Sequence, residues 1–196
     1  MQLRRAMQRQ NRANGITPLS KFLSLVLRHK PEAIGVQLDG SGWADISDIV
    51  EKSRKAGVNL TTDLICNIVA ASAKQRFAIS EDGLKIRANQ GHSLPVDLGL
   101  KTTKPPETLY HGTAGRNISS ILHQGICKGN RQHVHLSLDS EGALKVGRRH
   151  GSPAVVVIAA VRMHEDGFNF FESDNGVWLT DHVPKEYIAM TTKKES

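Results

Sequence analysis

The stretch RFAISEDGLKIRA, residues 76–88, contains two short runs of β-prone residues on either side of Glu81-Asp82-Gly83. Glycine tolerates the positive φ that a tight turn requires, so this pattern predicts a β-hairpin. Before this hairpin, the apolar residues recur at helical spacing and no run resembles a strand. We therefore expect the hairpin to follow a group of helices.

The first predicted helix covers residues 18–29, PLSKFLSLVLRH, where the apolar side chains form one helical stripe. Thr17 is placed to cap this helix, with Pro18 at the first helical position. The helix must end before Pro31, because the residue before a proline is disfavoured in the helical conformation.

Two further helices are predicted over residues 43–55 and 62–72, where apolar residues recur at helical spacing and Gly57 follows the first. Three helices followed by a hairpin is the sequence order of a winged helix. We therefore expect residues 17–92 to form a winged-helix lobe.

The pattern changes after residue 92. Residues 93–107 contain three prolines, two threonines and two lysines and are predicted to form a linker. Beyond them, strands are predicted over residues 108–112, 133–139, 153–161 and 176–180. Helices are predicted between the first three of these strands, over residues 117–124 and 140–149. Residues 108–196 are expected to form a strand-rich second lobe, which places the whole chain in the α+β class.

Lysine and arginine outnumber the acidic residues by 26 to 19, which gives a formal net charge of +7. This charge attracts polyanions, and nucleic acid is the most abundant one in a cell, although excess Lys and Arg can also serve solubility alone. Residues 1–16 contain four arginines but neither an acidic residue nor an apolar segment. We expect a basic disordered arm there rather than a secretory signal, with a mitochondrial presequence as the alternative.

The two cysteines, Cys66 and Cys127, lie far apart and have no C-x-x-C partner. They are expected to be reduced thiols of a cytoplasmic protein. No stretch approaches the roughly 18 apolar residues of a membrane span, so we expect no association with a membrane.

Several common nucleotide, metal and hydrolase motifs are missing from the sequence. The second lobe has neither G-x-G-x-x-G nor G-x-x-x-x-G-K-[ST], so a nucleotide must be held differently. H-E-x-x-H and G-x-S-x-G are absent as well, which argues against those zinc sites and serine hydrolases. His133 and His135 with His150 or Cys127 are an alternative metal set, but we expect no metal.

LRHKP, residues 27–31, places Arg28, His29 and Lys30 side by side where the first helix ends. Adjacent cations repel one another, so this arrangement is favoured when an anion lies between them. Other small polar motifs occur at predicted strand and helix ends: QGHS (90–93), YHGT (110–113), VHLS (134–137), GRRHG (147–151) and NGVWLT (175–180). Each alone is more typical of a turn or a helix end, but together they indicate a ligand surface rich in Arg and His donors.

In this order and spacing, these motifs resemble the KptA-type family of NAD-dependent RNA 2′-phosphotransferases, which is related to the enzyme that finishes tRNA splicing. The resemblance covers about residues 17–190 and rests on KFLSLVLRHKPEAIGVQLDGSGWADI, KQRFAIS, IRANQGHS, LYHGT, VHLS, VGRRHGSPAVV and SDNGVWLT. It implies a winged-helix lobe that binds RNA, joined to an ADP-ribosyltransferase-like lobe of mixed β structure that binds NAD. The resemblance connects this activity with tRNA splicing or RNA repair, but it does not imply which RNA is the natural substrate.

The resemblance also assigns roles to individual residues. A catalytic, phosphate-binding set of one histidine and three arginines falls on Arg28, His29, Arg76 and Arg149. Contacts to NAD fall on His111, Gly112, Thr113, His135, Leu136, Ser137 and Val177. Contacts to RNA or phosphate are expected from Gly91, His92 and Ser93.

The implied reaction removes an internal 2′-phosphate from RNA in two steps. The 2′-phosphate is first ADP-ribosylated by NAD, and nicotinamide leaves. Transesterification then releases RNA with a free 2′-hydroxyl and ADP-ribose 1″,2″-cyclic phosphate. Two alternatives stay open: an ADP-ribosyltransferase acting on nucleic-acid ends or proteins, and a winged-helix regulator that binds nucleic acid without releasing nicotinamide. No obligate protein partner is expected.

Overall fold

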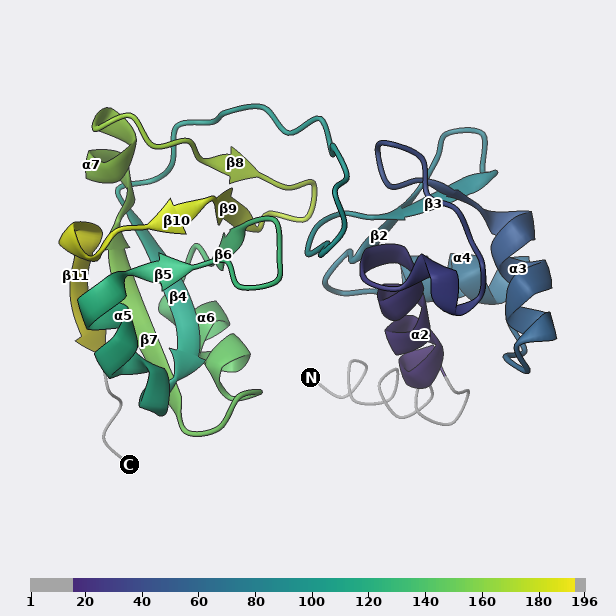
Figure 1. Ribbon diagram of the computed structural model, residues 1–196, viewed down its shortest axis with the longest axis horizontal. Helices are drawn as coiled ribbons and strands as arrows, with labels where there is room; N and C mark the ends of the chain where they lie inside the picture. Colours follow the sequence, from purple (N-terminus) through teal and green to yellow (C-terminus); the bar gives the residue numbers. More distant parts are fainter. Residues whose placement is uncertain (1–15, 193–196) are drawn as a thin grey trace. The chain divides into compact units, whose positions relative to one another are not determined.

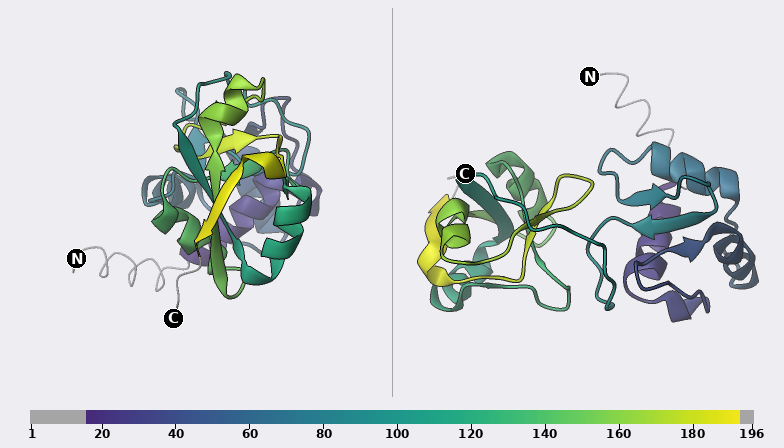
Figure 2. Two further views of the ribbon diagram at one scale, coloured as in Figure 1. Left: turned by 90° about the vertical axis from the view of Figure 1, so that its left-hand side faces the viewer. Right: turned by 90° about the horizontal axis from the view of Figure 1, so that it is seen from above.

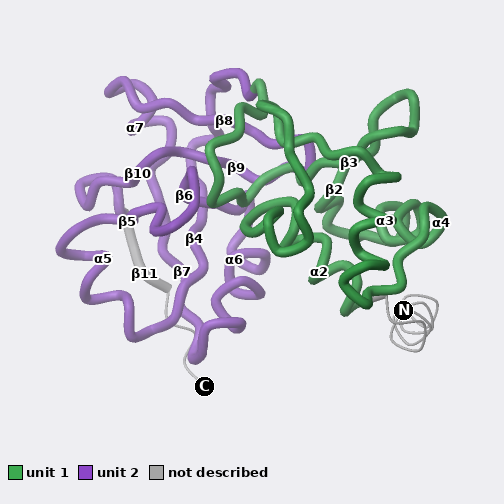
Figure 3. Tube along the Cα trace, turned by 45° about the vertical axis from the view of Figure 1, so that its right-hand side comes forward, with its two compact units in different colours: residues 1–99 green, residues 100–196 purple. Residues whose placement is uncertain are grey.

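The computed structural model describes residues 16–192 of the chain (Figure 1). The chain divides into two compact units, residues 1–99 and residues 100–196, which we call unit 1 and unit 2 (Figure 3). The predicted basic arm, residues 1–16, lies outside the described residues except for Ile16. Both units contain helices and strands, which confirms the α+β class.

Unit 1 combines helices with a small antiparallel sheet. Its elements are α2 (Ile16–Arg28), η1 (Pro31–Ala33), β1 (Ala44–Asp45), α3 (Ile46–Lys55), α4 (Thr62–Ala70), β2 (Phe77–Ile79) and β3 (Lys85–Ala88). The sheet has the order β1-β3-β2, and β2 and β3 form the predicted hairpin (Figure 1, Figure 2). Gly83 at its turn has a φ of +74°, the conformation for which glycine was required.

Helix α2 is held in unit 1 by its apolar stripe. Leu23, Val26 and Leu27 are fully buried in a core that also takes side chains from α3, α4, β2 and β3. Burying a side chain of this size contributes about 1.5–3 kcal/mol. The helix ends at Arg28, three residues before Pro31, as the sequence predicts.

The start of α2 differs from the prediction. The helix begins at Ile16, so Thr17 and Pro18 lie inside its first turn instead of forming the cap and the first position. Proline is compatible with this placement because the first N–H groups of a helix have no partner within it.

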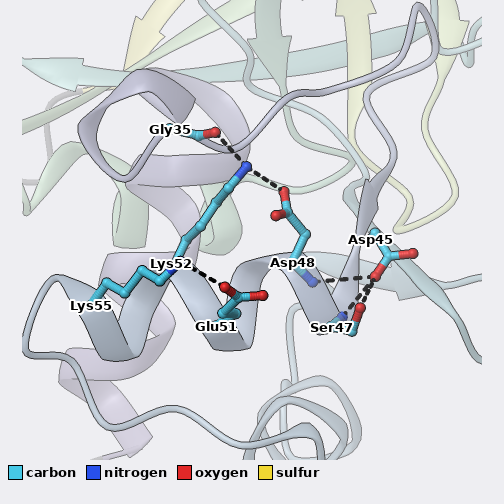
Figure 4. Close-up of polar contacts among 7 residues, drawn as sticks. All are labelled: Gly35, Asp45, Ser47, Asp48, Glu51, Lys52 and Lys55. Atoms are coloured by element: carbon cyan, nitrogen blue, oxygen red, sulfur yellow. Dashed lines mark hydrogen bonds and ion pairs between the residues drawn. The ribbon is translucent and has the colours of Figure 1, made fainter.

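Asp45 fixes the start of α3 (Figure 4). Its Oδ1 accepts hydrogen bonds from the N–H groups of Ser47 at 2.8 Å and Asp48 at 3.2 Å, which satisfies two N–H groups at the helix start. The helix predicted from residue 43 therefore begins only at Ile46, and Ala44 and Asp45 form β1.

Lys52 joins α3 to the segment that follows η1. Its Nζ donates a hydrogen bond of 2.6 Å to the carbonyl oxygen of Gly35 and lies 2.8 Å from Oδ2 of Asp48 (Figure 4). The Asp48–Lys52 pair has the i,i+4 spacing that supports a helix by a few tenths of a kcal/mol, roughly 0.2–0.5. Gly35 is thereby fixed at the start of the long connection to β1.

Unit 2 is built from three small sheets and several short helices. Its elements are β4 (Thr108–Ala114), η2 (Gly115–Asn117), α5 (Ile118–Gln124), β5 (Ile126–Cys127), β6 (Val134–Leu136), α6 (Ser140–Gly147), β7 (Pro153–Ala159), α7 (Ala160–Glu165), β8 (Phe171–Glu172), β9 (Trp178–Thr180), β10 (His182–Val183), η3 (Lys185–Tyr187) and β11 (Ile188–Thr192). The sheets have the orders β11-β7-β4, β6-β9-β8 and β10-β5. Neighbouring strands in all three are antiparallel.

A bridge links β4 to the end of β6. The N–H of Tyr110 donates to the carbonyl oxygen of Ser137 at 2.9 Å, and the N–H of Ser137 donates back to Tyr110 at 2.8 Å. This bridge places the YHGT and VHLS motifs next to each other although they are distant in sequence.

Several predicted boundaries in unit 2 need correction, since β4 extends to Ala114 and β9 begins only at Trp178. The apolar run predicted as one strand over residues 153–161 is two elements, because β7 ends at Ala159 and α7 follows at once. The strand predicted over residues 133–139 is limited to β6, because Asp139 caps α6 by accepting a 2.6 Å hydrogen bond from the N–H of Gly142. The helix predicted to end at residue 149 ends at Gly147.

Gly112 allows α6 to lie directly against β4 (Figure 1). A Cβ built on Gly112 would overlap the carbonyl oxygen of Ala143 and lie 3.0 Å from the backbone nitrogen of Gly147. Both obstacles are backbone atoms, which no side-chain rotation can move away. The glycine is therefore needed for the packing of unit 2, in addition to any contact with a ligand.

Replacing Gly112 by alanine should lower the free energy of unfolding by about 3 kcal/mol, because either α6 or β4 must move. Thermal or denaturant unfolding measures the effect. Gly115→Ala is the matched control in the same unit, since a Cβ on Gly115 lies 3.6 Å from the nearest oxygen, an ordinary contact. Equal stability of the two variants would contradict the packing role of Gly112.

Candidate functional site

Arg28 is the last residue of α2 and reaches the segment before β2. Its Nη2 donates a hydrogen bond of 3.2 Å to the carbonyl oxygen of Arg76, and its guanidinium lies 5.8 Å from the ring centre of Phe77. The carbonyl oxygen of Arg28 accepts the N–H of Ser93 at 3.0 Å. Arg28 thus connects three segments of unit 1 that are distant in sequence.

Arg76 is held by an unusual backbone turn. Gln75, directly before it, has a φ of +40°, a left-handed conformation that is uncommon for residues other than glycine. Asn89, which is buried, donates its side-chain NH₂ to the carbonyl oxygen of Gln75 at 2.7 Å and its N–H to that of Arg76 at 3.0 Å. Strained backbone of this kind often marks a functional site, and here it fixes the position of Arg76.

His29 follows Arg28 and contacts the third segment. Its Nδ1 lies 3.0 Å from Oγ of Ser93, and the same Oγ donates a longer hydrogen bond of 3.4 Å to the carbonyl oxygen of Arg28. Gly91, two residues before Ser93, has a φ of +88°, and a Cβ there would lie 3.5 Å from Nη1 of Arg28. The QGHS motif therefore wraps around the end of α2.

His92 is the buried residue of this motif. It is only 1% exposed, and neither ring nitrogen has a hydrogen-bond partner among residues 16–192. Loss of hydration lowers the pKa of His92 to about 4, and the neighbouring positive charges of Arg28, His29 and Arg87 act in the same direction. His92 is therefore neutral at physiological pH and adds no further positive charge beside Arg28.

His29 and Arg76 also line one pocket of unit 1, with a volume of about 580 Å³, between α2 and the end of α4. Of the predicted catalytic set, the structure thus brings Arg28, His29 and Arg76 together in unit 1. Arg149 belongs to unit 2, where it is exposed just after α6. The predicted RNA contacts Gly91, His92 and Ser93 all lie beside Arg28 or His29.

In unit 2, His111 and His135 lie next to each other across the bridge between β4 and β6. Nδ1 of His111 is 3.0 Å from the carbonyl oxygen of His135, so it must donate, and the neutral ring keeps Nε2 as an acceptor. The pKa of His111 is lowered, mainly by burial and further by the charges of Arg131 and His150, although the bond to His135 opposes this. His111 is thus a neutral residue with a defined tautomer.

Arg131 is a residue of this region that the sequence motifs did not identify. Its Nη1 lies 3.4 Å from Nδ1 of His135, so that nitrogen accepts and the neutral ring of His135 carries its proton on Nε2. The pKa of Arg131 is lowered by loss of hydration and by the nearby charge of Arg149. The available signal was its position in NRQHVHLS, just before a strand with alternating histidines.

The other predicted NAD contacts also lie near this part of unit 2. Thr113 is buried, and its Oγ1 accepts a 3.0 Å hydrogen bond from the side chain of Asn117. Leu136 is buried opposite Trp178 in the β6–β9 pair. Val177 directly precedes Trp178, in a turn where Ser173 Oγ donates to its carbonyl oxygen at 2.9 Å.

Residues 16–192 contain neither a candidate metal site nor a candidate membrane-spanning helix. Within that range, no three His, Cys, Asp or Glu side chains are grouped so as to hold a metal ion. The helices of the same residues are all too short or too polar to cross a membrane.

A model of the family described as "RNA 2′-phosphotransferase, Tpt1 / KptA family" matches residues 14–182. The chain belongs to the Tpt1/KptA family. This confirms the resemblance noted in the sequence, and every motif on which it rested lies inside the matched range.

Individual members of the Tpt1/KptA family are similar over most of their length. A probable RNA 2′-phosphotransferase of Flavobacterium johnsoniae is 52% identical over 170 residues, which are 87% of this chain and 93% of the relative. Proteins with the same name are 52% identical in Acaryochloris marina, over 87% of this chain and 94% of the relative, and 53% identical in Pectobacterium carotovorum, over 88% and 94%.

The low pKa of His92 predicts how stability depends on pH. The folded state binds this proton only near pH 4, whereas the unfolded chain binds it near the ordinary pKa of 6.5. Between these values acid favours the unfolded state, so stability falls as the pH drops from 7 toward 4. The contribution is about 3 kcal/mol, at about 1.36 kcal/mol per pKa unit.

His92→Phe, which keeps a buried ring, should remove this part of the pH dependence. Denaturant unfolding at pH 7 and pH 4.5 measures the difference for each protein. His123→Phe, at an exposed position of α5, is the control and should leave the difference unchanged. An equal loss of stability on acidification in wild type and His92→Phe would show that His92 does not titrate as stated.

Proposed function

We propose that the protein removes an internal 2′-phosphate from RNA, with NAD as the co-substrate that accepts it. The observation that carries this proposal is the family match over residues 14–182. It is supported by the grouping of Arg28 and His29 with the segment of Arg76 in unit 1. A phosphate dianion supplies the negative charge that such adjacent cations favour.

In the first step, an oxygen of the 2′-phosphate forms a bond to the ribose carbon of NAD that carries nicotinamide, and nicotinamide leaves with the electrons of the broken C–N bond. A phosphate monoester has a second pKa near ~6, so the attacking oxygen is already ionised at neutral pH. No general base is required for this step.

In the second step, the 2″-hydroxyl of the ADP-ribose attacks phosphorus, and the 2′-oxygen of the RNA leaves and takes up a proton. Negative charge increases on the phosphoryl oxygens. We assign their stabilisation to Arg28, Arg76 and Arg149, because a guanidinium is permanently charged and can bind two oxygens at once. His29 is the residue of the set that can transfer the proton.

NAD is assigned to unit 2, whose residues fit its chemistry. His111 offers an acceptor at Nε2 for a ribose hydroxyl, and His135 offers a donor at Nε2. Arg131, whose Nη1 lies 3.4 Å from Nδ1 of His135, is a cation of this region that can bind the pyrophosphate group of NAD. We assign the adenosine side of NAD to His111 and the nicotinamide riboside side to His135, as the resemblance implies.

We further propose that unit 1 is a winged-helix lobe and unit 2 an ADP-ribosyltransferase-like lobe. The three helices and the β2–β3 hairpin of unit 1 support the first assignment. The small antiparallel sheets of unit 2, with histidine motifs at their junction, support the second.

Two adjacent arginines provide a sharp test of the assignment. Arg148 and Arg149 are both exposed at the end of α6, but only Arg149 is assigned to the phosphate. Arg149→Ala should slow turnover by about 10²- to 10³-fold, as is typical for one preorganised donor. Arg148→Ala is the matched control. Its turnover should stay within about tenfold of wild type, because removing this side chain changes the activation free energy only slightly.

The assay uses NAD and a short RNA with one internal 2′-phosphate, and it measures dephosphorylated RNA, nicotinamide and ADP-ribose 1″,2″-cyclic phosphate. Absence of all products from folded protein that binds NAD would contradict the proposed function. Nicotinamide without cyclic phosphate would indicate a transferase that stops after the first step. Sequence-specific DNA binding without nicotinamide release would indicate a regulator.

Ser93 should control the tautomer of His29. The Ser93 hydroxyl has one proton, and the carbonyl of Arg28 can only accept, so donation to that carbonyl requires His29 Nδ1–H to donate to Oγ. This makes Nε2 the nitrogen that exchanges a proton with the substrate. Ser93→Ala should slow the second step about 10- to 100-fold, as for partners that orient metal-bound histidines.

The measurements are the pH–rate profile of the second step and a long-range ¹H–¹⁵N NMR spectrum of His29. We expect the Nδ1–H tautomer in wild type and its loss in Ser93→Ala, with rescue in Ser93→Thr, which keeps the hydroxyl. An Nε2–H tautomer in wild type would show that the hydrogen bonds run in the opposite direction.

A further inference from the structure

The pocket of unit 1 beside His29 and Arg76 extends beyond the residues assigned to the 2′-phosphate. Lys21, Ser24 and Leu25 of α2 line it on one side, and Ser72 and Lys74 line it on the other. Its volume of about 580 Å³ exceeds what a single phosphate group needs. The pocket therefore has room for neighbouring parts of the same ligand.

The charge of this pocket is strongly one-sided. Lys21 and Lys74 are exposed on its walls, and His29 and Arg76 lie in the same lining. Asp and Glu do not occur among the lining residues that the structure describes. Such a surface attracts a chain of negative charges, as a nucleic-acid backbone provides.

Uncharged groups make the pocket suitable for nucleotides in particular. Ser20, Ser24 and Ser72 place hydroxyl groups in the lining, where they can hydrogen-bond ribose hydroxyls and phosphate oxygens. Leu25 is 40% exposed although it is a large apolar residue, and the methyl groups of Ala71 and Ala73 are close by. These groups offer an apolar contact for a ribose or an unstacked base.

The spacing along α2 supports a path for a strand. Lys21, Leu25 and Arg28 are separated by four and three residues, so they lie on one face of the helix. At a rise of 1.5 Å per residue, Lys21 and Arg28 are about 10 Å apart along the axis. That distance corresponds to roughly three nucleotides of a stacked strand at a rise of 3.4 Å each.

We propose that this pocket binds the single-stranded RNA next to the 2′-phosphorylated nucleotide. Lys21 and Lys74 contact backbone phosphates, and Leu25 contacts a ribose or base. The inference rests on the proposed function, because it needs the 2′-phosphate near His29 and Arg76. Its consequence is that affinity increases with the length of the RNA, while the rate of the chemical steps does not.

The test compares a 2′-phosphorylated dinucleotide with a hexanucleotide that carries the same 2′-phosphate at its centre. In the double variant Lys21→Gln/Lys74→Gln, KM for the hexanucleotide should rise about 10- to 30-fold at 0.1 M salt, and the salt dependence of KM should become less steep. The value of kcat, and KM for the dinucleotide, should stay as in wild type. Lys55→Gln/Lys85→Gln removes the same charge from exposed positions outside the pocket and is the matched control.

Direct binding separates this inference from the proposed function. Fluorescence anisotropy with the hexanucleotide, with and without its 2′-phosphate, should show weaker binding of both to the double variant. If wild type forms no product but this loss of binding persists, the proposed function fails and the RNA pocket stands. Unchanged hexanucleotide binding, an equal loss in the control variant, or equal competition by an acidic peptide would overturn the inference.

Discussion

The hydrogen bonds made by Arg28 hold the candidate phosphate site of unit 1 in place. Its carbonyl oxygen accepts the N–H of Ser93, and its guanidinium donates to the carbonyl of Arg76, so three distant segments meet at the end of α2. Both partners are uncharged backbone groups. These backbone contacts position the guanidinium of Arg28 at the end of α2, where we propose that a phosphate binds. A site organised in advance in this way has little reorganisation to undergo when charge develops on the substrate.

This arrangement is maintained at some cost to stability. Gln75 has a left-handed backbone, and His92 buries two ring nitrogens that find no hydrogen-bond partner in the described part of the chain. Each feature is unfavourable by itself, and both lie beside residues of the proposed phosphate site. The neutral imidazole of His92 fills space beside Arg28 without adding a positive charge. The QGHS segment can therefore pack against Arg28, His29 and Arg87.

The sequence predicted those parts of the fold that have a local cause. The end of α2 before Pro31 and the hairpin turn at Gly83 were both predicted, because proline and glycine restrict or widen the backbone conformations at or next to their own positions. The α7 boundary at Ala160 was missed, since an apolar run has no periodicity that separates the end of a strand from the start of a buried helix. The environments of His92 and Arg131 were missed for a different reason. Burial and neighbouring charge depend on tertiary contacts, which no spacing in the sequence records.

The proposed chemistry also explains why a hydrophobic residue can stand at Val177. Many ADP-ribosyltransferases use a glutamate near the end of the site, and the resemblance implies that Val177 stands at the matching place. A phosphate monoester is ionised at neutral pH and needs no activation by a general base. A carboxylate would instead repel the dianion that the arginines attract, by about 2 kcal/mol at 4 Å even in bulk water and by more where water is excluded. Val177 is therefore compatible with a site whose nucleophile is ionised before it binds. In such a site the groups that matter most for catalysis are the arginines that bind the phosphate oxygens.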